Sequence, residues 1–330
     1  MGVLRIHFTV ADAMSVRVAV LGAHAEMQHS FTKLSAPRGQ LVFDAWRART
    51  AMRTRVLPPD VREVARFVTP PADLITLVGP ADEYAQAAER LHAAPAGPLG
   101  HELTCTPAAA AGPRSAWIGD LAAGDGAARQ RLTRALGDYH EAAIAPYWPR
   151  IRTLLEKDRA ARVDTLARHG LGALLSGLGP LLSWSAPVLS LHDPALDRDY
   201  HLAGRGLTLA PTVFGDDHPG VFVPWDDSPA LLMYPVALDP PTAMRLWHNP
   251  ADPGDRALAS LLGATRAAAL RVVAGGCTTS ELAKRLNISP GGASQHATVL
   301  RESGLISSHR YRNTVRHTIT RLGKDLLNIS

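Results

Sequence analysis

The residues between Thr278 and Gly304 constrain the fold of this chain more than any other stretch. Thr278 and Glu281 have capping-box spacing, in which a hydroxyl and a carboxylate satisfy the free N–H groups at the start of a helix. Ser289 is a good N-cap, and Pro290 suits the first helical position, where its missing N–H costs nothing. Gly304 is a usual helix stop. The sequence therefore predicts two short helices separated by a tight turn.

The second of these helices has two faces. Ala293, Ala297 and Leu300 form the apolar face. The opposite face carries Gly291, Ser294, Gln295, Thr298 and Arg301. A helix that enters the major groove of DNA needs small residues for close approach, hydrogen-bonding side chains for base edges and cations for phosphates. Gln295 is the first candidate to read a base, because glutamine pairs well with adenine. The alternative is an ordinary solvated polar face.

A basic hairpin follows the second helix. Residues 305–310 and 314–320 fit two strands, and Asn313 between them tolerates a left-handed turn. Cations gather toward the predicted tip at Arg310, Arg312 and Arg316, as contacts with phosphates would require. The order of capped helix, turn, capped helix and basic hairpin predicts a winged helix-turn-helix. Some winged helices serve protein contacts instead, which leaves an alternative to DNA binding.

Residues 255–327 resemble the ArsR/SmtB family of bacterial winged-helix transcriptional regulators. The likeness lies in CTTSELAKRLNISPGGASQHATVLRESGLISSHRYRNTVRHTITRLGKDLL and in the preceding RALASLLGATRAAALRVVAGG. It implies a homodimer whose two recognition helices enter successive major grooves of a palindromic operator in double-stranded DNA, and a repressor that a ligand relieves. The wing tip departs from the family, which often has glycine where this chain has Arg312 and Asn313. The large N-terminal region is similar to that of longer actinobacterial relatives.

This interpretation assigns a role to each candidate DNA-binding residue. We expect Ser294, Gln295 and Thr298 to face base edges. We expect the phosphates or the minor groove to be contacted by Ser289, Arg301, Arg310, Arg312 and Arg316. Gly291 and Asn313 complete the set, as a point of close approach on the helix and as the turn of the wing.

Charge, cysteines and hydropathy limit the remaining possibilities. Residues 255–330 hold eleven Lys and Arg against four Asp and Glu, whereas the whole chain has a net charge of only +5. The cationic character is thus confined to the predicted DNA module. Two distant cysteines, Cys105 and Cys277, indicate a reducing cytoplasm. Residues 171–191 carry no charge, but glycines and prolines interrupt them, so we expect a helix end, a loop and a strand and no membrane span.

The predicted fold class is α+β, with a mostly helical N-terminal region, a small antiparallel sheet and a C-terminal winged helix. We expect an effector and dimerisation region over 1–250, with a subdivision near 106–126, and the winged helix over 255–330. The expected helices are 9–20, 23–34, 41–55, 61–67, 81–93 and 127–177, the last interrupted at Pro146 and Pro149. In the helix 41–55 the expected buried positions are Leu41, Phe43, Trp46 and Met52. Residues 3–8 read as a strand and 101–105 as a strand or loop. An antiparallel meander is expected from 188–191, 206–214, 221–225 and 230–238.

The N-terminal region is long enough to sense a ligand. Metal sensing is disfavoured, because the helix before the recognition helix lacks cysteine and the last helix lacks histidine. A His/Asp cluster near residues 192–201 and 216–218 leaves a metal role open, and Cys277 leaves oxidation open. Aromatic residues favour a small organic effector: Trp46, Trp148, Trp184, Trp225, Tyr139, Tyr147 and Tyr234. We assign none of them as a ligand-binding residue, because each is equally suited to the hydrophobic core.

An enzyme is the rival class of function. The sequence has no Gly-rich cofactor loop, no Walker loop, no Gly-x-Ser-x-Gly and no His-Glu-x-x-His. We therefore expect no catalytic residue and no cofactor. Two alternatives remain beside the regulator. One is a DNA-architectural or protein-interaction protein without an effector, and the other is an enzyme that uses the winged helix for dimerisation.

Overall fold

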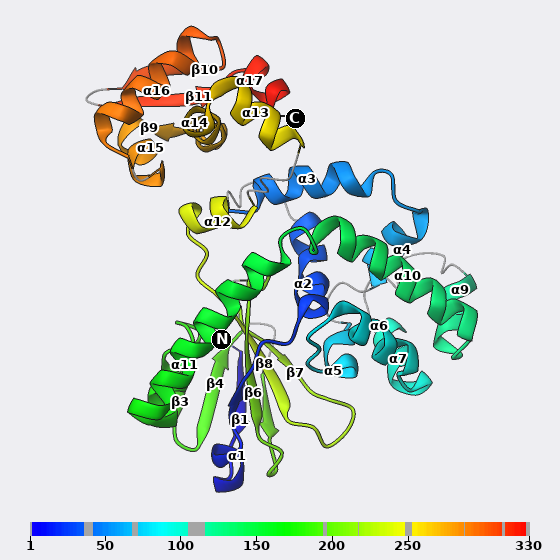
Figure 1. Ribbon diagram of the computed structural model, residues 1–330. Helices are drawn as coiled ribbons and strands as arrows, with labels where there is room; N and C mark the ends of the chain where they lie inside the picture. Colours follow the sequence, from blue (N-terminus) through cyan, green and yellow to red (C-terminus); the bar gives the residue numbers. More distant parts are fainter. Residues whose placement is uncertain are drawn as a thin grey trace. The chain divides into compact units, whose positions relative to one another are not determined.

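The computed structural model describes residues 2–35, 42–67, 72–104, 116–193, 197–216, 218–247, 253–286, 288–311 and 314–327 (Figure 1). They form two compact units. Unit 1 comprises residues 1–36 and 50–237, and unit 2 comprises residues 37–49 and 238–330. The unit that contains the winged helix therefore includes two further segments, one of them from the N-terminal part of the chain. The class is α+β, as predicted.

Unit 1 combines helices with two four-stranded sheets. Its helices are α1 (Val10–Met14), α2 (Ala23–Ser35), α4 (Pro59–Phe67), α5 (Leu74–Val78), α6 (Tyr84–Ala93), α7 (Ala96–Thr104), α9 (Ala116–Ala122), α10 (Gly126–Ala143) and α11 (Trp148–Ser176). Its strands are β1 (Val3–His7), β2 (Arg17–Val18), β3 (Leu182–Ser185), β4 (Val188–His192), β5 (Arg198–His201), β6 (Leu207–Thr212), β7 (Gly220–Phe222) and β8 (Ala230–Pro235). The sheet orders are β3-β4-β1-β5 and β2-β6-β8-β7.

One core joins both sheets and the end of α11. Leu4 and Ile6 of β1 enter it together with Leu209 of β6 and Leu232 of β8, and Leu175 contributes from α11. The second sheet is covered on its other face as well, where a separate cluster brings β6 and β8 against α2 and α5. A sheet buried on both faces needs nearly continuous apolar strands. This explains the unbroken runs at 207–214 and 230–235.

The prediction of an antiparallel meander was wrong. β6 pairs with β8 in parallel, β2 pairs with β6 in parallel, and β1 runs parallel to β5. Only β7–β8, β1–β4 and β3–β4 are antiparallel among the described pairs of unit 1. The short turns between apolar runs suggested neighbours in sequence, but β6 and β8 are buried on both faces and meet side by side, with β7 at the edge.

Several local predictions also need correction. Thr9 caps a helix as expected, but α1 ends at Met14, and β2 follows where the helix was predicted to continue. Residues 101–104 belong to helix α7 and not to a strand or loop, and Cys105 lies outside the described residues. Part of the expected connection at 106–126 is helix α9, while residues 105–115 are not described. Met52 is 50% exposed, whereas Phe43 and Trp46 are buried as expected. Leu41 lies outside the described residues.

Other local predictions were confirmed. The proline break divides the long helix into α10 and α11. The uncharged stretch at 171–191 becomes the end of α11, a turn and the strands β3 and β4. Across the described ranges, no helix combines the length and the apolar character that a membrane span requires.

Unit 2 contains the winged helix and two segments that precede it. Part of α3 (Asp44–Thr54) belongs to this unit, as does α12 (Pro240–Trp247). Trp46 and Trp247 are both buried, with ring centroids 6.3 Å apart, and Phe43 packs beside them. The Arg49 guanidinium donates to the Trp247 carbonyl over 3.0 Å. These contacts tie α3 to α12 through an aromatic cluster.

Candidate nucleic-acid interface

The C-terminal elements follow the order of a winged helix-turn-helix. Helices α13 (Pro253–Leu262) and α14 (Ala264–Ala274) precede β9 (Cys277–Thr278). The helix pair α15 (Thr279–Leu286) and α16 (Pro290–Glu302) follows, then β10 (Ile306–Tyr311), β11 (Thr314–Ile319) and α17 (Arg321–Leu326). The three strands form a sheet in the order β10-β11-β9. This arrangement confirms the predicted winged helix.

Both predicted helix caps are present. The Thr278 N–H donates to the Glu281 carboxylate over 2.8 Å, and the Glu281 N–H donates to the Thr278 hydroxyl over 3.3 Å. The Gly292 N–H donates to the Ser289 hydroxyl over 3.1 Å. The Ile288 N–H donates to the Ala283 carbonyl over 3.1 Å and closes the end of α15. These bonds satisfy helix-end groups and fix the direction in which α16 leaves the turn.

Helix α16 buries its apolar face and exposes its polar one. Ala293, Ala297 and Leu300 enter the core of the domain with residues of α14, α15 and β10. On the other face Gly291, Ser294, Gln295 and Arg301 are exposed, Ser289 is exposed at the cap, and Thr298 is half-buried. The space beside Gly291 is open, so its missing side chain leaves room for a close approach. A compact row of small, polar and cationic groups results, which is the chemistry that a major-groove helix requires.

The wing places its two described arginines differently from the sequence expectation. In the β10–β11 register, Arg310 lies opposite Val315 and Arg316 lies opposite His309. Neighbouring residues of a strand point to opposite faces, so Arg310 and Arg316 lie on opposite faces of the hairpin. Both are exposed, but they do not form one cluster. Arg312 and Asn313 lie outside the described residues.

A buried histidine that was not predicted from the sequence connects the wing to α15. His317 is almost fully buried in β11, and its ring contacts the Thr279 hydroxyl at 2.9 Å and the Ser308 hydroxyl at 2.8 Å. Burial and the charge of Arg301 lower the pKa of His317. The alternation of Val315, His317 and Ile319 along the strand was the available signal, because it puts all three on the inner face.

Cys277 is buried where β9 pairs with β11. Burial raises the pKa of its thiol to about 11. The thiol is therefore protonated at neutral pH, and the thiolate is the reactive form. This environment favours a role for Cys277 in packing over a role in sensing oxidation through its thiol.

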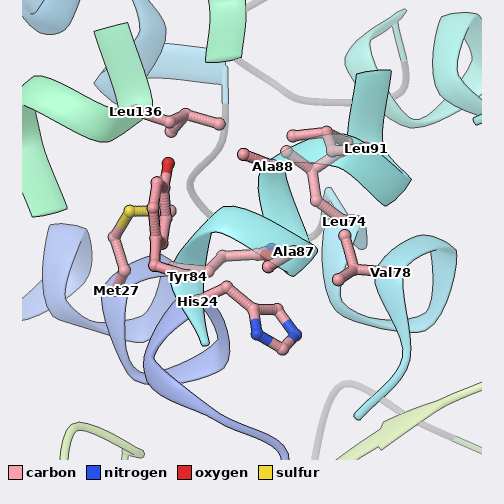
Figure 2. A pocket seen from close by; sticks show the side chains of 10 residues that line it. His24, Met27, Leu74, Val78, Tyr84, Ala87, Ala88, Leu91 and Leu136 are labelled. Atoms are coloured by element: carbon pink, nitrogen blue, oxygen red, sulfur yellow. The ribbon is translucent and has the colours of Figure 1, made fainter. Parts of the chain in front are cut away.

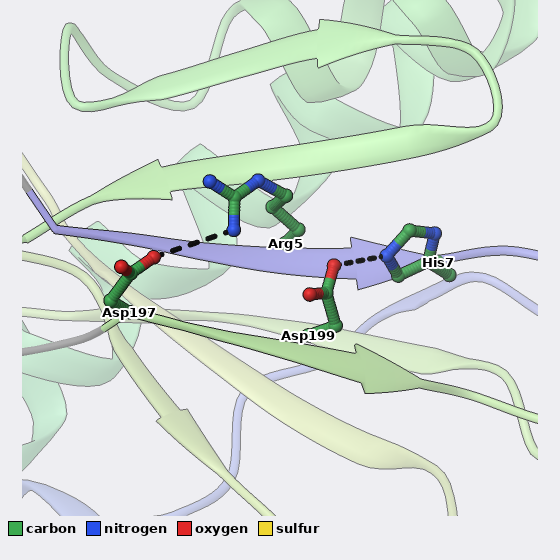
Figure 3. A network of polar contacts seen from close by, with 4 residues as sticks. All are labelled: Arg5, His7, Asp197 and Asp199. Atoms are coloured by element: carbon green, nitrogen blue, oxygen red, sulfur yellow. Dashed lines mark hydrogen bonds and ion pairs between the residues drawn. The ribbon is translucent and has the colours of Figure 1, made fainter.

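Asp199 and His201 of the expected His/Asp cluster lie on β5 of the first sheet, whereas Asp216 follows β6 of the second sheet and pairs with Lys33 over 2.8 Å. β1 and β5 are neighbours, and the Arg5 guanidinium lies 3.5 Å from the Asp197 carboxylate and the His7 ring 2.7 Å from the Asp199 carboxylate. Figure 3 shows both pairs. His201 stacks on His7 with ring centroids 4.4 Å apart. Within the described ranges, no three His, Cys, Asp or Glu residues are grouped so as to hold a metal ion.

The order of elements, the capped helix pair and the polar face of α16 define a winged helix-turn-helix DNA-binding domain. Residues 257–307 match the family described as winged helix-turn-helix DNA-binding. Residues 81–240 match a family of unknown function (DUF5937), which covers much of unit 1. No curated protein and no solved structure matches the chain.

Proposed function

We propose that the protein is a sequence-specific transcriptional regulator of the ArsR-like type that acts as a cytoplasmic, homodimeric repressor without catalytic activity. The observation that carries this proposal is the exposed face of α16, where Ser294, Gln295 and Arg301 stand beside the small Gly291. Side chains of this kind on the second helix of a helix-turn-helix read base edges and hold phosphates. The concentration of positive charge in the same domain supports the same reading.

The individual contacts are assigned by side-chain chemistry. Ser294, Gln295 and Thr298 read base edges in the major groove. Ser289 and Arg301 hold phosphates at the two ends of α16, and the wing contributes through Arg312, Asn313 and one of the two arginines Arg310 and Arg316. Because Arg310 and Arg316 lie on opposite faces of the hairpin, one of them faces the DNA and the other faces away.

The homodimer has support in unit 2. Leu261 on α13 is 70% exposed and Leu322 on α17 is 57% exposed. Large apolar side chains exposed on the first and last helices of the domain suit a protein interface. A dimer of winged helices would place two copies of α16 on a palindromic operator, half-sites one helical turn of DNA apart.

Genomic selection tests the proposal. The purified full chain captures sheared genomic DNA from its own organism at about physiological salt, where non-specific binding is weak, and the bound fragments are sequenced. We expect a few sharp peaks near promoters that share a palindrome. Gln295→Ala should flatten these peaks. Gln86→Ala, at an exposed glutamine of α6, is the matched control and should leave them unchanged.

One outcome would contradict the proposal, and another would contradict only the assignment of Gln295. Diffuse capture with no shared motif in the unaltered protein would indicate an architectural or interaction role for the winged helix. Sharp peaks that survive in Gln295→Ala would keep the regulator but remove Gln295 as a base reader. Sedimentation of the free protein and of its operator complex checks the dimer, which requires two chains for each palindrome.

A further inference from the structure

The inner face of the wing packs on the core of the DNA-binding domain. In an antiparallel pair, residues directly opposite each other share a face. Ile306 lies opposite Ile319, and Ser308 lies opposite the buried His317. The first of these pairs belongs to the hydrophobic core of the domain. Arg310 is two residues beyond Ser308 on β10, so it lies on this inner face, nearer the tip.

The outer face of the wing holds Arg316 beside the start of α15. Arg316 lies opposite Thr278 of β9, so the two side chains share the outer face. Thr278 and Glu281 form the hydrogen bonds that cap α15. A carbon added at Gly276 would lie 3.5 Å from a guanidinium nitrogen of Arg316. The Arg316 guanidinium therefore lies along the segment that leads into α15.

The two arginines also differ in their electrostatic surroundings. The Thr278 N–H, and after it the positive charges of Arg285 and Arg316, hold the pKa of Glu281 below its usual range. The Glu281 carboxylate thus balances part of the charge of Arg316 within the protein. In the parts of the chain that the structure describes, Arg310 forms no hydrogen bond or ion pair. Its exposed guanidinium is available to an external anion.

The recognition helix lies on the inner side of the sheet. Leu300 of α16 shares a core with Ile306 of β10. Burial, and after it the charge of Arg301, lowers the pKa of His317, so the exposed Arg301 lies within electrostatic reach of the inner face. DNA that approaches the exposed face of α16 therefore meets the wing from its inner side, where Arg310 lies.

The buried His317 anchors the strand that carries Arg310. Its ring contacts the Ser308 hydroxyl of β10 at 2.8 Å and the Thr279 hydroxyl of α15 at 2.9 Å. These contacts connect β10 to the helix-turn-helix two residues before Arg310. A side chain that is carried by an anchored strand loses less conformational freedom when it binds.

We propose that Arg310 is the wing arginine that binds a DNA phosphate, on the same side of the domain as Arg301, and that Arg316 supports the capping box of α15 without touching DNA. The role of Arg310 rests on the DNA-binding function proposed above. The role of Arg316 does not depend on it.

The salt dependence of DNA binding tests Arg310. The full chain is titrated with its operator and with random duplex DNA at several salt concentrations. Arg310→Ala should lower the slope of binding against salt by about one ion per chain on both DNAs, because one phosphate contact is lost. Arg310→Lys keeps the charge and should keep the slope. Arg316→Ala should keep it as well, as should the control Arg168→Ala at an exposed position of α11.

The Glu281 carboxyl tests Arg316 without DNA. Its pKa can be followed by NMR in the full chain. Arg316→Ala should raise the pKa of Glu281, because a nearby positive charge is removed, and Arg316→Lys should restore it. Arg310→Ala should leave it unchanged.

The outcomes separate this inference from the proposed function. A lower salt slope in Arg316→Ala, or an unchanged slope in Arg310→Ala, would overturn the assignment of the wing arginines. An unchanged Glu281 pKa in Arg316→Ala would overturn the role of Arg316 at the capping box. If the unaltered protein bound neither DNA, the proposed function would fail together with the role of Arg310, and the Glu281 measurement would still decide the role of Arg316.

Discussion

Glu26 makes unit 1 less stable as the pH rises from acid to neutral. Its carboxyl is fully buried and accepts two backbone N–H groups, but burial outweighs these bonds and raises the pKa of Glu26 from 4.5 to about 7. The folded state therefore holds a proton that the unfolded state has released. Its contribution to stability is complete below pH 4.5 and is lost as the pH rises through about 7. The loss is about 3 kcal/mol, at roughly 1.4 kcal/mol for each pKa unit.

Glu26→Gln removes this titration and keeps an acceptor for the two N–H groups. We expect the free energy of unfolding of Glu26→Gln, relative to the unaltered protein, to rise by about 3 kcal/mol between pH 4 and pH 8. Denaturant unfolding at several pH values measures this difference. Glu89→Gln, at an exposed position of α6, is the matched control and should show no such trend.

Comparison between variants is needed because other buried groups titrate in the same window. Burial raises the pKa of Asp73 to about 6, which acts in the same direction as Glu26. Burial lowers the pKa values of His24 and His29 to about 4, so their contribution is lost as the pH falls below 6.5. These effects cancel in the difference. A difference that does not vary with pH would refute the reasoning about Glu26.

Three further predictions concern the winged helix. Gln295→Ala should cost about 1–3 kcal/mol on the operator and little on random DNA, measured by titration of both; equal losses would remove it as a base reader. Arg310→Ala or Arg316→Ala, but not both, should lower the slope of binding against salt concentration by about one ion per site, and a loss in both would contradict their opposite faces. Gly323→Ala should destabilise the domain by about 1–3 kcal/mol in thermal unfolding, because the added carbon would meet the Leu305 carbonyl oxygen at 2.2 Å, and an unchanged midpoint would contradict this close packing.

The winged helix could be predicted because its signals are local. Thr278 and Glu281 form hydrogen bonds at the N-terminus of α15, and Ser289 caps the N-terminus of α16. Each of these bonds joins residues that are three positions apart in the chain. The period of Ala293, Ala297 and Leu300 then fixes which face of α16 is buried. Short-range hydrogen bonds and helical periodicity depend only on residues that are close together in the chain. The exposed face of α16 therefore follows from the sequence.

The sheets of unit 1 could not be predicted in the same way. Apolar runs gave the strands β6 and β8, but the pairing of Leu209 with Leu232 joins residues that only the fold brings together. Parallel and antiparallel neighbours require the same kinds of side chain, so composition did not distinguish them. His101 at the start of the expected 101–105 strand lies instead in α7, where packing against neighbouring helices outweighs local propensity.

By itself the sequence determined a capped helix-turn-helix with a basic hairpin, the concentration of positive charge in that domain and the break between α10 and α11, because each depends on residues close together in the chain. Only the tertiary structure decided that Arg310 and Arg316 lie on opposite faces of the wing, and that His317 on β11 and His24 (Figure 2) and Gln28 on α2 are buried. These features depend on strand register and on contacts between segments that are distant in the chain. Burial shifts the pKa values and leaves some polar atoms without partners, and it exists only once those segments have packed.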